Sequence, residues 1–155
     1  MSEYDQDIVG WSTETAEKLR QLRSGKRVND LDWDHLIEEV EALGRSELRA
    51  VESLIQQTLI HLLKMTAWPN ALASGHWMIE IGSFVAQVQR EYQPAMAQRI
   101  DVDAIYTKAR KAVLAGFYDD HPPANVPDNC PISLNELLDD DASAGMLARK
   151  FSRSV

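Results

Sequence analysis

The order of apolar and polar residues along the chain predicts a protein built from α-helices. Apolar side chains recur every three or four residues in five long segments, the spacing that places them on one face of a helix. The predicted helices cover residues 12–24, 33–43, 47–65, 75–92 and 102–117. No segment alternates apolar and polar residues for long enough to indicate a strand. We therefore expect an all-α fold, an antiparallel helical bundle of about five main helices with a short C-terminal helix.

Residues that favour helix ends support these boundaries. Ser12 or Thr13 can cap the first helix, and Gly25 suits the left-handed position that follows its last turn. Pro69 interrupts the helical pattern after residue 65. The segment Ser133–Glu136 has the sequence of a capping box, which predicts a short helix over residues 134–139.

A tight turn at Gly44 is the central prediction for the first half of the chain. Asp32 is a good N-cap for the helix over residues 33–43, Gly44 can end that helix, and Ser46 can cap the next one. The two helices would then fold back on each other as a hairpin. The apolar stripe of the first of them is expected to face the core; its members are Trp33, Leu36, Ile37, Val40 and Leu43.

The helix over residues 47–65 is expected to be the most buried element, because apolar residues cover about half of its circumference. His61 lies at the edge of this wide apolar face. Its imidazole is either a core side chain satisfied by one hydrogen bond or a ligand or titrating base. In both cases a buried imidazole needs a polar neighbour. The proposed hairpin makes Glu39, Glu41 and Glu47 the nearest candidates in sequence.

Residues 31–47 hold six carboxylates, and two interpretations of them remain open. Most of these side chains fall away from the apolar stripe, which is typical of a solvated helix face. The alternative is a binding site at the junction of the two hairpin helices. Its candidate residues are Glu39, Glu41, Glu47 and His61.

Length and charge suggest one domain over residues 1–140, followed by a tail over residues 141–155. The chain has 155 residues and a formal net charge of −8. The tail holds one acidic and three basic residues, so its net charge is +2 and that of residues 1–140 is −10. Because binding to a nucleic acid backbone needs a basic face, we expect no nucleic acid partner. An acidic body is compatible with a basic protein partner, with a homo-oligomer, or only with solubility.

Cysteine content and hydropathy indicate a cytoplasmic protein. Cys130 is the only cysteine, so no internal disulfide can form. No apolar run approaches the roughly 20 residues that span a bilayer, and we expect no membrane partner. The acidic start of the chain does not resemble a signal peptide.

The usual catalytic patterns are missing from the sequence. Cys130 lies in a proline-rich connector without a nearby activating base, and there is no glycine-rich phosphate loop. No histidine follows a glutamate at the spacing that carboxylate-bridged metal bundles use. We therefore predict no catalytic residue, no metal site and no cofactor.

Four segments occur in an order that resembles the DUF29 family, a bacterial domain of unknown function. They are YDQDIVGWSTETAEKLR, LDWDHLIEEVEALGRSE, HLLKM and CPISLNELLD, and together they span about residues 4–139. The most specific of them is the segment over residues 31–47. Its matching residues are Leu31, Asp32, Trp33, Glu38, Glu39, Glu41, Leu43, Gly44, Ser46 and Glu47. His61 to Lys64 match a later part of the pattern. The resemblance implies a helical bundle and supplies no reaction.

Two functions remain open from the sequence. The first is a non-enzymatic protein-interaction or regulatory module, which the acidic body and the missing catalytic patterns favour. The second is an enzyme or a ligand- or metal-binding bundle that uses Glu39, Glu41, Glu47 and His61. The two differ in whether these four side chains converge in space.

Overall fold

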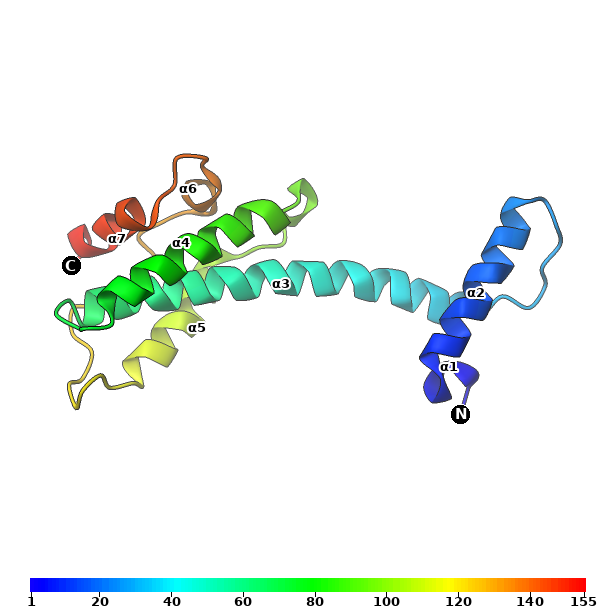
Figure 1. Cartoon of the computed structure of the whole chain (residues 1–155), viewed down its shortest axis with the longest axis horizontal. Helices are drawn as coiled ribbons and strands as arrows, with labels where there is room; N and C mark the ends of the chain where they lie inside the picture. The colour runs from blue at the N-terminus through cyan, green and yellow to red at the C-terminus, as the bar shows by residue number, and fades with distance from the viewer. The chain divides into compact units, whose positions relative to one another are not determined.

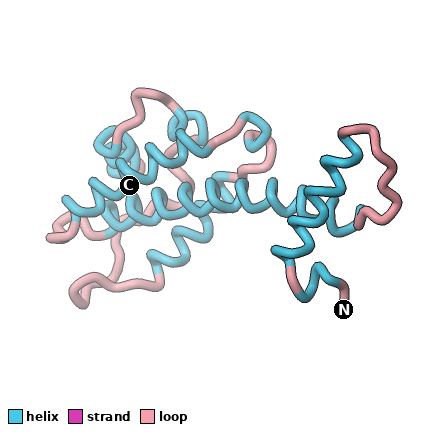
Figure 2. Tube along the Cα trace, turned by 45° about the vertical axis from the view of Figure 1, so that its right-hand side comes forward, coloured by secondary structure: helices cyan, strands magenta, loops and turns pink.

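The structure, a computed structural model, describes all residues of the chain, 1–155, and is all-α (Figure 1). It contains no strand, and only an isolated bridge joins Tyr118 and His121 (Figure 2). The helices are α1 Glu3–Gln6, α2 Ile8–Arg23, α3 Trp33–Ala67, α4 Ser74–Glu91, the 3₁₀ turn η1 Pro94–Met96, α5 Val102–Leu114, α6 Leu134–Leu138 and α7 Ala144–Arg153. The predicted all-α fold is confirmed.

The chain divides into two compact units. The first unit is Met1–Ser46 and the second is Glu47–Val155. The helix α3 contributes its first part to the first unit and the rest to the second.

The first unit holds α1, α2 and the beginning of α3. Asp7 caps α2 by accepting a hydrogen bond from the backbone N–H of Gly10, so the helix begins before the predicted caps. Ser12 and Thr13 lie inside α2, where both hydroxyls donate to the carbonyl oxygen of Val9. Gly25 follows the helix with a φ of +84°, which confirms the predicted left-handed position.

The second unit packs α4, α5, α6 and α7 around the later part of α3. In Figure 1, α4 lies antiparallel to that part of α3, after the turn that contains Pro69. The fully buried apolar residues of α3 lie on the wide apolar face predicted for residues 47–65 and are Val51, Ile55, Leu59, Leu62 and Leu63. The tail is part of this unit, because Leu147 and Phe151 of α7 are completely buried in its core.

The predicted turn at Gly44 is wrong. The helix α3 runs without interruption from Trp33 to Ala67, and Ser46 lies inside it instead of capping a new helix. Gly44 has no positive φ; among the glycines only Gly25 does. The reason is energetic: a glycine inside a helix costs only about 1 kcal/mol relative to alanine, and strong helix formers flank Gly44 on both sides.

The predicted burial of the first part of α3 is also wrong. Four members of the expected core stripe are more than half exposed: Trp33 (57%), Ile37 (54%), Val40 (65%) and Leu43 (65%). The side of α3 that α1 and α2 contact is a different one, which carries His35 and Glu39. The apolar stripe therefore faces solvent within the first unit.

Candidate functional site

The four residues predicted to form a site are spread along α3. Glu39 and Glu41 belong to the first unit, whereas Glu47 and His61 belong to the second. Because the helix continues through Gly44, no hairpin folds the two glutamates back towards His61. The proposed junction between two helices therefore does not exist, and each residue has its own surroundings.

The three glutamates have separate environments. Glu39 is half-buried and accepts a hydrogen bond of 2.5 Å from the hydroxyl of Tyr4. This hydrogen bond is the main cause that raises the pKa of Tyr4 to about 12. Glu41 forms an exposed ion pair with Arg45 at 3.5 Å, and Glu47 is exposed.

A polar and aromatic network surrounds the start of α3. Asp32 accepts hydrogen bonds from Nδ1 of His35 at 2.7 Å and from Nε1 of Trp11 at 3.2 Å. The backbone N–H of His35 also donates to Asp32, which confirms Asp32 as the N-cap. The ring of Tyr4 stacks on His35 with centroids 4.1 Å apart. This network fixes α1 and α2 to α3.

The paired side chains of this network shift each other's ionisation. The hydrogen bond from His35 lowers the pKa of Asp32, and the same bond raises the pKa of His35.

The sequence did not predict Tyr4 and Trp11 as partners of this network, because no spacing rule connects them with α3. The capping role of Asp32 was the only signal for this network in the sequence.

His61 has the polar neighbour that its burial requires, but the neighbour comes from α4. Nδ1 of His61 donates to the carbonyl oxygen of Gln57 at 2.8 Å, and Nε2 lies 2.7 Å from Oε2 of Glu80. The other carboxylate oxygen of Glu80 lies 3.4 Å from Nε2 of His76. The predicted candidates Glu39, Glu41 and Glu47 are not its partners. The antiparallel packing of α4 on α3 brings Glu80 to His61.

The hydrogen bonds of His61 restrict where its protons lie. A carbonyl oxygen cannot donate, so Nδ1 must carry a proton. The contact between Nε2 and Glu80 then needs one further proton, on either the imidazole or the carboxyl group. Phe84 covers the ring edge-on, with centroids 5.3 Å apart. The pair is a sheltered, proton-sharing contact that ties α3 to α4.

The other polar groups give little sign of chemistry. No group of three or more His, Cys, Asp or Glu side chains is arranged to hold a metal ion. Burial raises the pKa of the Cys130 thiol, and its Sγ donates to the carbonyl oxygen of Ile132. A raised pKa reduces the fraction of thiolate, which is the nucleophilic form.

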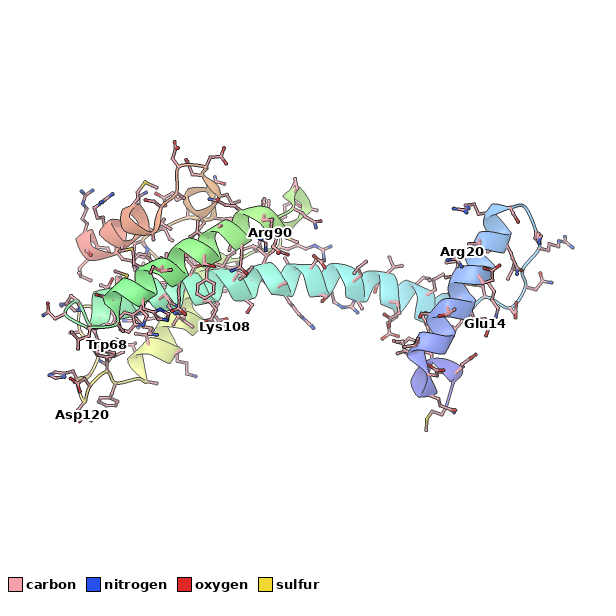
Figure 3. All side chains as sticks on the ribbon, viewed as in Figure 1. Glu14, Arg20, Trp68, Arg90, Lys108 and Asp120 are labelled. Atoms are coloured by element: carbon pink, nitrogen blue, oxygen red, sulfur yellow. The ribbon has the colours of Figure 1, made fainter.

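A hollow of about 330 Å³ lies where the turn after α3 meets the loop after α5. Its walls include Trp68, Tyr118 and Pro122. Trp68 uses its ring nitrogen to donate to the carbonyl oxygen of His121, and Figure 3 shows Trp68 and Asp120 at this end of the unit. Asp119 and Asp120 have positive φ, which aspartate tolerates better than most residues. The hydrogen bonds and φ angles account for a tight loop and do not define a ligand.

The exposed stripe of α3 is the feature that a stable core does not explain. Throughout, "the α3 stripe" means Trp33, Ile37, Val40 and Leu43. They are four of the protein's exposed large apolar side chains and share one helix face. Contiguous apolar surface of this kind marks interaction sites on soluble proteins more often than scattered single residues do.

These features define a helical bundle with an unpartnered apolar helix face and no recognisable catalytic centre. A family model described as "Domain of unknown function DUF29" matches residues 3–142. The chain belongs to this family, so the predicted resemblance is confirmed. No curated protein matches the chain.

A solved structure has a similar fold. It is described as the crystal structure of an α-helical protein of unknown function from Rhodospirillum rubrum. The two chains are 28% identical, the TM-score is 0.67, and the match covers 97% of this chain and 98% of the other. Neither comparison indicates a specific function. No helix combines the length and apolar character needed to cross a membrane.

Proposed function

We propose that this protein is a non-enzymatic interaction module that binds a protein partner through the α3 stripe. The observation that carries the proposal is the exposure of Trp33, Ile37, Val40 and Leu43 on one helix face. A chain of this length has enough apolar residues to bury a core, and it does so in its second unit. Leaving a tryptophan and three aliphatic side chains in water therefore calls for a second surface to cover them.

The chemistry of the stripe suggests what covers it. Its residues recur at helical spacing over three turns, so the best-fitting partner presents another amphipathic helix. Asp34 and Glu41, two exposed charged residues, lie beside the stripe on α3. A polar rim around an apolar centre is the common anatomy of protein interfaces.

Photo-crosslinking in the native host tests the proposal. A benzophenone amino acid replaces Val40 in the full chain, and in the control it replaces Ile79, an exposed isoleucine on α4. We expect irradiation to give a discrete crosslinked product from position 40 and none from position 79. If position 40 gives no discrete product, the stripe is not a docking surface and the proposal fails.

We also propose a cytoplasmic location, without nucleic acid as a ligand. The single half-buried thiol of Cys130 fits a reducing compartment. The net charge of −8 opposes binding to phosphate backbones. Fractionation of host cells, followed by immunoblotting of the untagged chain, tests the location; recovery from the membrane or secreted fraction would contradict it.

A further inference from the structure

The hollow beside Trp68 combines a mostly apolar wall with one free carboxylate. Its volume of about 330 Å³ lies at the lower end of the range of small-molecule sites. Most of the side chains that line it are apolar or aromatic, and they are Ala67, Trp68, Ala71, Tyr118, Pro122 and Ala124. Asp119 also lines the hollow and is exposed, and its carboxylate forms no hydrogen bond or ion pair within the protein.

The two ring N–H donors beside the hollow are already used inside the protein. Trp68 donates from Nε1 to the carbonyl oxygen of His121 at 3.0 Å, and His121 donates from Nδ1 to the carbonyl oxygen of Asp119 at 2.6 Å. The carboxylate of Asp119 and, in the neutral imidazole, Nε2 of His121 therefore remain as acceptors. No lysine or arginine lines the hollow. These groups complement a ligand that carries positive charge and donates hydrogen bonds.

The rings behind the hollow already hold one cation of the protein itself. Tyr118 packs beside Trp68 and Trp77, with ring centroids 6.2 and 5.4 Å away. Lys64 places Nζ over the ring of Trp77, 4.7 Å from its centroid. Indole and phenol rings attract cations to their faces, because the ring quadrupole makes these faces negative. Trp68 and Tyr118 offer the same attraction on the side of the hollow.

We propose that this hollow binds a small organic cation, an alkylguanidinium or alkylammonium group. The apolar part of the cation packs against Trp68 and Tyr118, and its charged end pairs with the carboxylate of Asp119. The net charge of −8 also favours a cationic ligand over an anionic one. The hollow belongs to the second unit and the α3 stripe to the first, so this site does not depend on the proposed function.

NMR titration of the full chain with butylguanidinium tests the site. We expect shifts of the indole N–H signal of Trp68 and of the amide signals of residues 67–71 and 118–124, with a dissociation constant on the order of 1 mM. N-butylurea has nearly the same shape without the charge, and it should bind about tenfold more weakly. Equal binding of the two compounds, or no binding of butylguanidinium, would overturn the proposal.

Two asparagine variants form a matched pair for the carboxylate. Asp119 lines the hollow and Asp120 does not, whereas both are exposed and have positive φ, which asparagine also tolerates. Asp119→Asn should weaken the binding of butylguanidinium about threefold to fivefold, because one ion pair is lost. Asp120→Asn should change it less than about twofold at physiological salt. Equal weakening in the two variants would overturn the pairing with Asp119.

The apolar wall is tested with a shorter ligand. Methylguanidinium has the same charge as butylguanidinium but three fewer methylene groups, so it removes less apolar surface from water. We expect it to bind about tenfold more weakly. Equal binding of the two guanidinium compounds would overturn the contact with Trp68 and Tyr118.

The same cationic group occurs in free amines and in the side chains of a protein partner. A tripeptide with a central arginine and blocked ends distinguishes these sources. Binding as tight as that of butylguanidinium assigns the site to a side chain of a partner, whereas binding about tenfold weaker assigns it to a free small molecule. Both results keep the cation site. The crosslinking at position 40 is independent of them, so it can fail or succeed without changing this inference.

Discussion

At the scale of single residues, the contact between His61 and Glu80 is the most consequential one in the second unit. His61 is 8% exposed, and its two ring nitrogens are both engaged, one by a backbone carbonyl and one by the carboxylate. A buried polar atom that loses its partner costs more than the hydrogen bond itself contributes. Glu80 therefore stabilises the packing of α4 on α3.

Removal of this carboxylate should destabilise the protein measurably. We expect Glu80→Ala to lower the free energy of unfolding by about 1–3 kcal/mol, because Nε2 of His61 is left unsatisfied. His76→Ala is the control, since His76 is exposed and only 3.4 Å from the other oxygen of Glu80; it should cost less than about 0.5 kcal/mol. Urea denaturation measures both. If Glu80→Ala and His76→Ala lower the free energy of unfolding by the same amount, the contact between His61 and Glu80 adds no stability.

The pair of Asp32 and His35 predicts a pH dependence at the start of α3. The pKa of His35 is raised, so its contribution is complete below its ordinary value of 6.5 and is lost as the pH rises through the folded-state pKa. The pKa of Asp32 is lowered, so its contribution is complete above 3.8 and is lost as the pH falls through its folded-state pKa. The pair therefore stabilises the helix start most between pH 3.8 and 6.5.

NMR titration of the His35 ring tests this pairing. We expect a pKa above 6.5 in the intact chain and a return towards 6.5 in Asp32→Asn, which keeps an acceptor for the helix cap. His76, which is exposed on α4, serves as an internal reference, because its NMR signals should be the same in the intact chain and in Asp32→Asn. A His35 pKa that is the same in both proteins would contradict the pairing.

At the scale of elements, the continuity of α3 has the largest consequences. One uninterrupted helix of 35 residues replaces the expected hairpin, and it moves the stripe residues from a core position to the surface. Its later part is held by α4, which packs antiparallel to it, and its first part by the contacts of Tyr4 and Trp11 with His35, Glu39 and Asp32. The same periodic sequence therefore serves as core in one unit and as surface in the other.

Gly44→Ala distinguishes a continuous helix from a turn. We expect the variant to raise the free energy of unfolding by about 0.4–1 kcal/mol, because alanine restricts the unfolded chain and suits a helix. A left-handed turn at this position would instead make the variant less stable by about 1 kcal/mol. Thermal and urea unfolding measure whether the substitution raises or lowers the free energy of unfolding.

At the scale of the whole molecule, stability is concentrated in the second unit. That unit holds most of the buried side chains, whereas the first unit buries only Trp11, Thr15 and Leu31. Regions with few buried apolar contacts open at lower free energy than the core does. The proposed interaction surface, the α3 stripe, lies on the less stable unit, where binding can add most.

Hydrogen exchange should resolve this difference. We expect the amides of α2 to exchange faster than those of residues 51–63 in α3, which surround the fully buried core. Leu59→Ala should lower the global free energy of unfolding by about 2–5 kcal/mol, since Leu59 is completely buried. Exchange in α2 should change little in that variant. Uniform protection along the chain would contradict the division of stability.

Much of the fold follows from local sequence. Five predictions are confirmed, because each depends on residues that are neighbours in the chain. They are the helical class, the left-handed Gly25, the cap at Asp32, the break at Pro69 and the capping box at Ser133. The family membership also followed from sequence order. The partner of His61 did not follow from the sequence, since Glu80 and His61 are 19 positions apart and meet only through the packing of two helices.

The sequence by itself determined where helices form and that α3 carries an apolar face. The tertiary structure alone decided what covers that face: α4 and its neighbours cover it after residue 50, whereas Trp33, Ile37, Val40 and Leu43 stay more than half exposed and Leu36 is half-buried. The physical reason is that periodicity reports the presence of an apolar side, whereas burial depends on elements distant in the chain. A glycine flanked by strong helix formers likewise ends a helix only when the rest of the fold needs a turn there.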